Sequence, residues 1–109
     1  MEVILEKNGT KYTMTIDEED YNRITPLSPS IKLTKHITPY VVANNGRMLN
    51  KFIVNSNNNE IVIHKNGNKL DLRKENLEVI TRKELTDLIR KGEIKTVMSE
   101  SGEIQYERM

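Results

Sequence analysis

The chain has no cysteine, no tryptophan and one phenylalanine among its 109 residues. Without cysteine it can form no disulfide, no thiolate zinc site and no cysteine nucleophile. With so few aromatic side chains, its core has to be built mainly from isoleucine, leucine, valine and methionine. No apolar run approaches the roughly 20 residues of a membrane-spanning helix, and no charged-then-apolar leader opens the chain. These absences predict a soluble, cytoplasmic protein with no membrane partner.

Charge is unevenly distributed, although the formal net charge is only +1. Residues 1–30 carry three basic and six acidic side chains, residues 31–95 carry thirteen and seven, and residues 96–109 carry one and three. A basic middle between acidic ends is compatible with a surface that faces phosphate. It is equally compatible with an ordinary solvated surface, so charge alone assigns no function.

The start of the chain predicts a hairpin followed by a short helix. Asn8-Gly9 lies between two alternating runs, which is typical of a two-residue hairpin turn. Thr15 and Glu18 have the spacing of a capping box, which predicts a short helix over residues 17–24. The next segments are expected to be short: a loop (25–35), a strand (37–43), a turn (44–46), a strand or short helix that periodicity does not separate (47–55), and a polar connector (55–59).

The second half of the chain predicts strand, long loop, strand and helix, over 60–64, 65–75, 77–81 and 81–91. Thr81 and Glu84 form a second capping box, and Gly92 is well placed to end the helix. The helix is expected to bury Leu85, Leu88 and Ile89. A last hairpin could turn at Ser101-Gly102. The predicted fold class is therefore α+β in a single domain, with a small N-terminal sheet and short helix (1–54), a strand-loop-strand-helix core (60–92) and a tail or terminal hairpin (93–109).

His64 lies at the end of the strand that opens this core. A histidine beside a loop held by asparagine side chains can be positioned to take a proton from water. A nuclease also needs a divalent cation at the scissile phosphate, and Mg²⁺ prefers oxygen ligands, including at least one carboxylate. The question is whether oxygen ligands accompany His64.

The stretch HKNGNKLDLRKENLEVIT, residues 64–81, resembles the central motif of HNH endonucleases, the ββα-metal family of phage and homing enzymes. The upstream stretches TIDEEDYNRI and PYVVANNGRMLNKFI are similar to the leader of phage HNH proteins. The resemblance implies a ββα-metal core over residues 60–92, a phage-type protein in a bacterial cytoplasm, and duplex DNA as the partner.

The resemblance also assigns roles to single residues. His64 matches the general base, and Asn76 matches the asparagine that clamps the loop and orients the base. The family places a metal-binding Asp or Asn directly before the base, where this chain has Ile63. It places a last ligand, Asn or His, on the helix at the position of Leu85. An earlier family histidine is replaced by Asn50.

Ile63 and Leu85 offer no lone pair to Mg²⁺, so these departures predict that metal-dependent cleavage is lost, that His64 is a vestigial base and that no cofactor is needed. We expect the two aliphatic side chains to pack together where the family has an ionic bridge. An active site could still be built from unconventional ligands, with Mg²⁺, if Glu84, Glu60 or Asp71 reached the ion.

The cations of the loop and of its neighbouring elements are predicted to contact DNA phosphates, which gives affinity without sequence readout. They are Arg47, Lys51, Lys65, Lys69, Arg73, Lys74, Arg82 and Lys83. Two alternatives stay open. One is a protein-binding regulator or inhibitor on the same scaffold, using the acidic segment near Asp17 and the acidic tail. The other is an active nicking endonuclease with unconventional ligands.

Overall fold

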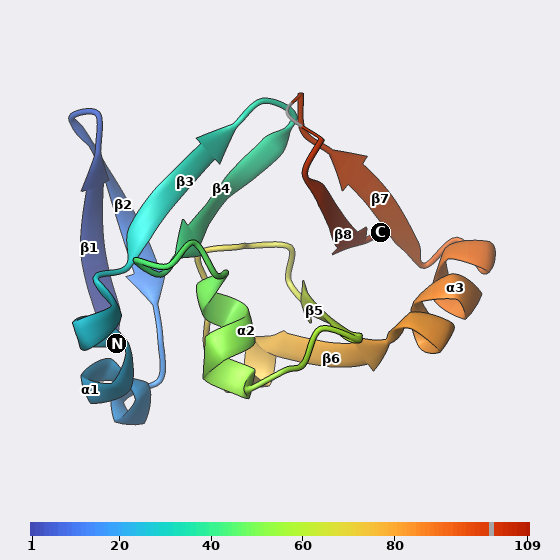
Figure 1. The fold of residues 1–109 in the computed structure, drawn as a ribbon, viewed down its shortest axis with the longest axis horizontal. Helices are drawn as coiled ribbons and strands as arrows, with labels where there is room; N and C mark the ends of the chain where they lie inside the picture. The colour runs from blue at the N-terminus through green and yellow to red at the C-terminus, as the bar shows by residue number, and fades with distance from the viewer. Residues whose placement is uncertain (101) are drawn as a thin grey trace.

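The computed structural model describes residues 1–100 and 102–109. Within these residues, eight strands pair in sequence order into four separate two-stranded antiparallel sheets, with short helices between them (Figure 1). The elements are β1 (Glu2–Lys7), β2 (Thr10–Thr15), η1 (Glu18–Asp20), α1 (Tyr21–Ile24), η2 (Thr25–Leu27), β3 (Ser30–Thr34), β4 (Ile37–Val42), α2 (Leu49–Val54), β5 (Glu60–His64), η3 (Lys74–Asn76), β6 (Leu77–Thr81), α3 (Arg82–Arg90), β7 (Ile94–Met98) and β8 (Ile104–Arg108). The mixed α and β content agrees with the predicted class.

The first hairpin is confirmed. Asn8 and Gly9 have φ values of 53° and 81°, and a two-residue turn with both central residues left-handed matches the twist of the flanking strands. The capping box predicted for Thr15 and Glu18 is wrong, because the short helical segment begins after Asp17 and has no side-chain cap. The backbone of Thr15 is held in β2: its N–H donates to Leu70 O at 2.8 Å, and its carbonyl accepts from a loop amide at 2.7 Å.

The loop predicted over 25–35 is also wrong, because β3 forms within it and pairs with β4. The strand predicted over 37–43 and the turn at 44–46 are confirmed. The ambiguous segment after the turn is a helix, α2, which ends at Asn55 in the left-handed region (φ 53°). Helix α2 lies centrally in the molecule, between β4 and β6 (Figure 1).

Strand, loop, strand and helix follow in the predicted order, as β5, an irregular loop with one 3-10 turn, β6 and α3. Both hydrogen bonds of the Thr81–Glu84 capping box are present, and Gly92 follows the helix with φ 77°. The buried face of α3 is narrower than predicted: Leu85 is 5% exposed, whereas Ile89 is 41% exposed. Helix α3 lies at one end of the molecule, so only one edge of it meets the rest of the chain (Figure 1).

Strand β5 separates two apolar clusters because successive side chains point to opposite faces of a strand. Val62 belongs to a cluster with β2, α1, β3, β4 and α2. Ile61 and Ile63 belong to a second cluster with Ile80, Leu85 and a residue of the C-terminal hairpin. The face of β5 that carries Val62 therefore looks toward α2, and the face that carries Ile63 looks toward α3.

The tail forms the expected hairpin, β7 with β8, and β8 packs beside β5. Of the predicted turn, Ser101 lies outside the described residues. Within the described part of the chain, no helix is long and apolar enough to cross a membrane.

Candidate functional site

His64 is 7% exposed, and both of its ring nitrogens are engaged. Nδ1 lies 3.1 Å from the carbonyl oxygen of Asp71, and Nε2 lies 3.1 Å from Nδ2 of Asn50. Because a carbonyl can only accept, the ring proton belongs on Nδ1. Nε2 then carries the lone pair and accepts a hydrogen bond from the Asn50 amide. The nitrogen that a general base would use for water is therefore already occupied by a protein donor.

Burial lowers the pKa of His64 below its ordinary value, because the charged imidazolium loses its hydration, and the Lys69 ammonium lowers it further. The hydrogen bond to the Asp71 carbonyl acts in the opposite direction but does not outweigh burial. The imidazole is therefore neutral at physiological pH, as the assignment of its single proton to Nδ1 requires.

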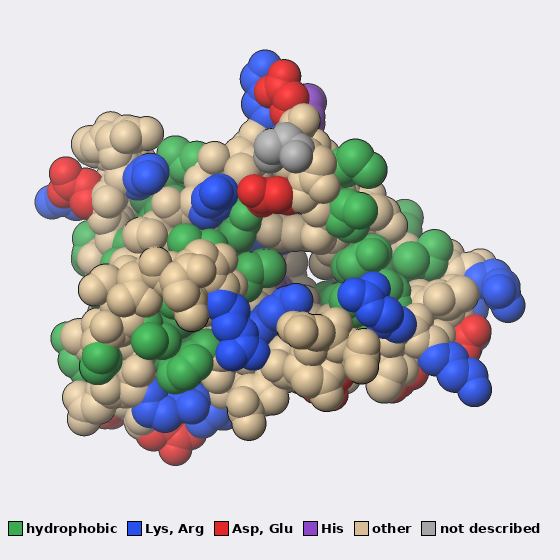
Figure 2. Space-filling view, in the orientation of Figure 1, with side chains coloured by type: hydrophobic (Ala, Val, Ile, Leu, Met, Phe, Trp, Pro, Cys, Tyr) green, Lys and Arg blue, Asp and Glu red, His purple; other side chains and the backbone are tan. Residues whose placement is uncertain are grey.

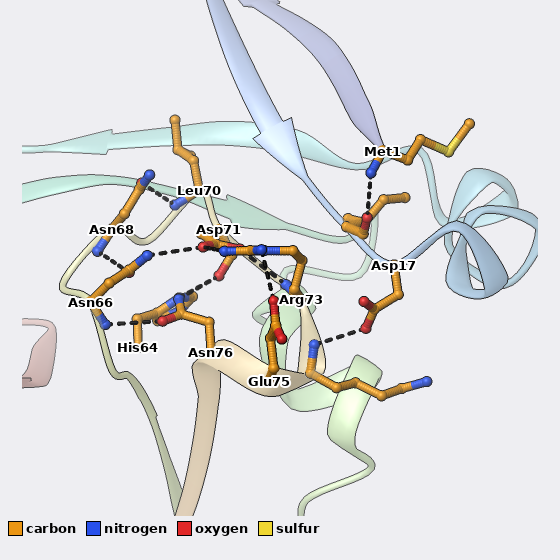
Figure 3. A network of polar contacts seen from close by, with 12 residues as sticks. Met1, Asp17, His64, Asn66, Asn68, Leu70, Asp71, Arg73, Glu75 and Asn76 are labelled. Atoms are coloured by element: carbon orange, nitrogen blue, oxygen red, sulfur yellow. Dashed lines mark hydrogen bonds and ion pairs between the residues drawn. The ribbon is translucent and has the colours of Figure 1, made fainter.

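Asn76 clamps the loop. Its Oδ1 accepts from the Asn66 N–H at 2.9 Å, and its Nδ2 donates to the same Asp71 carbonyl that His64 contacts, at 3.0 Å. Figure 3 shows His64, Asn66 and Asn76 gathered around that carbonyl. A second asparagine relay runs from Asn66 through Asn68 to the backbone of Leu70. The loop is held by short side-chain bonds, as an orienting role for Asn76 requires.

The Asp71 carboxylate serves the same loop. It accepts hydrogen bonds from the Arg73 guanidinium at 2.7 and 2.8 Å and from Asn66 Nδ2 at 2.9 Å. The guanidinium is the main reason that the pKa of Asp71 lies below its ordinary value, and burial opposes the shift. Both carboxylate oxygens are thus committed to neighbours in the loop.

The two positions to which the sequence resemblance assigns metal ligands are apolar and buried. Ile63 is fully buried and Leu85 is 5% exposed, and both belong to the second apolar cluster, as expected for side chains that pack together. Ile94 of β7 joins this cluster, and Tyr106 of β8 packs against it. The donor set does not fit Mg²⁺ at these positions, because neither side chain has a lone pair and the space is filled by hydrocarbon.

The three unconventional ligands are engaged elsewhere. The Glu84 carboxylate accepts from the Thr81 hydroxyl at 3.1 Å in the capping box. Glu60 accepts from the Asn57 N–H at 3.0 Å, and Asp71 is bound as described above. Across residues 1–100 and 102–109, no group of three or more His, Cys, Asp and Glu side chains is placed to hold a metal ion.

The C-terminal hairpin covers the His64 side of the loop. A cavity of about 60 Å³ remains between α2, β5 and β8, and Asn50, His64, Lys69 and Tyr106 are among the residues that line it. Asn50 Oδ1 is buried there without a hydrogen-bond partner in the described structure. Lys69, with a side chain 5% exposed, forms an ion pair of 3.2 Å with Glu107 of β8.

The eight cations predicted to contact phosphate divide into two groups. Three are paired with acidic side chains: Lys69 with Glu107, Arg73 with Asp71 and Glu75, and Lys74 with Glu19 and Asp20. Five have no acidic partner within 4 Å in the described part of the chain: Arg47, Lys51, Lys65, Arg82 and Lys83. Figure 2 shows Lys and Arg side chains both in the middle of one face and at its α3 end.

Residues 55–86 match the model of the HNH endonuclease family, described as HNH endonuclease. This segment contains β5, the loop, β6 and the first half of α3, so the match supports an HNH-family assignment for the part of the chain that carries His64 and Asn76. No curated protein and no solved structure matches the chain.

Two contacts of the site were not anticipated from the sequence. The replacement of a family histidine by Asn50 was visible in the sequence, but nothing showed that its amide would reach His64 from α2. The pairing of Lys69 with Glu107 had no sequence signal, because 38 positions separate the two residues and the tail had no predicted place in the fold.

Proposed function

We propose that this chain is an HNH-endonuclease-like protein that no longer performs metal-dependent cleavage and that binds duplex DNA. The observation that carries the first part is the pairing of His64 Nε2 with the Asn50 amide. A base whose lone pair is occupied cannot take a proton from water until that bond is broken. The apolar, buried positions of Ile63 and Leu85 support the same conclusion, since neither can replace the missing ligands.

The loop and its clamp persist although the chemistry does not require them. His64 and Asn76 both bond the Asp71 carbonyl, so they fix the path of the loop between β5 and β6. In this proposal His64 is a structural residue. Its task is to hold the shape of the loop, which carries the exposed cation Lys65.

The proposed DNA surface consists of those five of the eight predicted cations that have no acidic partner, which we call the open cations. They are Arg47, Lys51, Lys65, Arg82 and Lys83. Phosphate contacts release counterions, so the affinity for duplex DNA falls as salt rises, with a slope of roughly −0.9 per phosphate contacted. Phe52 follows the open cation Lys51 in the sequence, but its side chain packs against the first apolar cluster, so base stacking on single strands is not expected to add affinity.

Equilibrium binding to a random-sequence duplex and to its separated strands, over a series of salt concentrations, tests the DNA-binding part. We expect a linear loss of log affinity with log salt, and tighter binding to the duplex. Lys7→Gln with Lys11→Gln removes two cations from the first hairpin, outside the proposed surface. This control variant should leave the salt slope unaltered. Absence of duplex binding at low salt contradicts the proposal.

A protein-binding role is the second candidate. It is favoured by Met98 and Ile104, which are 55% and 51% exposed and lie opposite each other on the C-terminal hairpin. Exposed apolar side chains that lie next to each other can form part of a patch that a protein partner covers. This role predicts partner capture that is insensitive to salt and is lost in Met98→Ser with Ile104→Ser, whereas DNA binding is unchanged in that variant.

A further inference from the structure

The C-terminal hairpin places its carboxylates on lysines of other elements. Glu107 pairs with Lys69 of the HNH-like loop at 3.2 Å, Glu103 with Lys32 of β3 at 3.8 Å, and Glu100 with a lysine of the β3–β4 turn at 3.6 Å. Three carboxylates along one hairpin thus lie against lysines of other elements. A row of carboxylates presents the same charge to a lysine as a row of phosphates.

The Glu107 contact differs from the other two in its burial. The Lys69 side chain is 5% exposed and that of Glu107 is 20% exposed, whereas the lysines paired with Glu103 and Glu100 are 47% and 71% exposed. Tyr106 and Glu107 also line a small cavity with His64, Gly67 and Lys69. The end of β8 therefore closes over the loop at the point where its one deeply buried cation lies.

We infer that the end of β8 is an intramolecular competitor of nucleic acid, in which Glu107 occupies the place of a phosphate at Lys69. The inference rests on the proposed DNA binding and concerns the regulation of that surface. In the closed state Lys69 is unavailable, and DNA meets only the open cations. Release of the last residues of β8 exposes Lys69 and adds a phosphate contact.

The structure limits what has to move. Residues 107–109 are held by the Lys69–Glu107 pair, by Arg108 on Glu78 at 2.7 Å, and by one backbone bond from Met109 to Glu93. Glu107 and Arg108 also pair with Lys95 and Ile94 in the β7–β8 ladder. Strands β7 and β8 form a separate two-stranded sheet, and the end of such a hairpin can open locally without unfolding the rest of the protein. Ile94, which anchors the hairpin in the second apolar cluster, lies on β7 and stays in place. The Arg108–Glu78 ion pair also holds the end of β8 in the closed state, and we call it the latch.

In this arrangement, the loss of one particular cation should raise the affinity for duplex DNA, whereas a count of charges alone predicts that it falls. Arg108→Gln removes a cation but also opens the latch, so it should bind duplex DNA about threefold more tightly than the unaltered chain. Arg90→Gln removes a cation from α3 that has no acidic partner in the described chain, and it should bind equally or more weakly. Glu107→Gln should gain more affinity than Glu6→Gln, its matched control on β1.

The test is a duplex titration of these four variants at one low salt concentration, with thermal unfolding of each, since Glu107→Gln leaves Lys69 without its carboxylate. Hydrogen exchange of residues 104–108, measured with and without duplex, gives a second readout, and faster exchange on binding is expected. The competition is refuted, and DNA binding stands, if the unaltered chain binds duplex but Arg108→Gln binds it as weakly as Arg90→Gln does. Slower exchange of residues 104–108 on binding would have the same meaning. If no variant binds duplex, both proposals are refuted.

Discussion

The side chains of Asn50 and His64 meet across the interface between α2 and β5, with Nδ2 of the amide 3.1 Å from Nε2 of the imidazole. Both residues are buried, at 3% and 7% exposure. In the sequence resemblance, Asn50 takes the position of a family histidine and His64 that of the family's base, so the contact joins two positions of the predicted site. It makes the imidazole part of the protein's internal hydrogen bonding, and the following predictions test that role.

Loss of the Asn50 amide should destabilise the fold. Asn50→Ala leaves the buried Nε2 of His64 without its donor, and an unsatisfied buried acceptor costs about 1–3 kcal/mol in the free energy of unfolding. Chemical denaturation measures this change. Asn58→Ala, in an exposed part of the 55–59 connector, is the control and should change stability by less than about 0.5 kcal/mol. Equal stability of the two variants would refute a buried, satisfied contact.

Stability should fall as the pH drops below neutrality because of His64. Its pKa in the folded state lies below the ordinary value of 6.5, so above that pH neither state takes up a proton there. As the pH falls through the unfolded-state value, the unfolded chain binds a proton that the folded chain resists, and the free energy of unfolding decreases. The decrease is at most about 1.4 kcal/mol per pH unit for one group.

His64→Gln should reduce that slope between neutral and mildly acidic pH, whatever its effect on absolute stability. His36→Asn is the matched control, because His36 is exposed and its left-handed backbone (φ 69°) is one that asparagine tolerates. If the slope persists in His64→Gln but disappears in His36→Asn, the proton uptake belongs to His36 and the prediction is contradicted.

Restoring the family's ligands should damage the fold before it restores chemistry. Ile63→Asp puts a carboxylate where the side chain is fully buried among hydrocarbon, which costs about 3–5 kcal/mol when no partner is present. We expect Ile63→Asp with Leu85→Asn to unfold at much lower denaturant concentration than Ile63→Val, which should lose only about 0.5–1.5 kcal/mol. A double variant that Mg²⁺ stabilises strongly would show instead that the pocket remains open to an ion.

The spacing of a capping box predicted the structure correctly at Thr81 and wrongly at Thr15. Thr81 and Glu84 form a capping box as predicted, because nothing outside the helix competes for Thr81. Thr15 has the same spacing to Glu18, but a segment 55 residues away in the chain, beginning at Leu70, binds its backbone and keeps it extended. Spacing predicts a cap only where tertiary contacts leave the residue free.

In the candidate site, too, local contacts could be predicted from the sequence and long-range contacts could not. The hydrogen bonds of Asn76 within the loop join residues five and ten positions apart, so the order of elements and the clamp by Asn76 could be predicted from the motif. Asn50 and Glu107 reach the site from α2 and β8, and no periodicity in the sequence encodes those approaches. The pairing of Lys69 and Lys74 could not be predicted for this reason, because their partners lie in distant segments of the chain.

The open cations should carry the salt dependence of duplex binding. Arg82→Gln with Lys83→Gln should lower the magnitude of the salt slope by roughly 1–2, because each lost phosphate contact removes about 0.9. Lys74→Gln, which also removes a lysine charge, is the control and should change the slope little, since the Lys74 ammonium is already paired with Glu19 at 2.7 Å and Asp20 at 3.2 Å. A larger loss of slope in Lys74→Gln than in the double variant would place the DNA surface on the loop.

Conversion of supercoiled plasmid to nicked circles, in Mg²⁺ and in Mn²⁺, is the most direct measurement of the central claim when it is run on the same sample that binds duplex DNA in a titration. The expected result is salt-sensitive binding with no nicking above the rate of a His64→Ala control. Metal-dependent nicking by the unaltered chain that disappears in His64→Ala would contradict it, and would make His64 a working base in spite of its bond to Asn50.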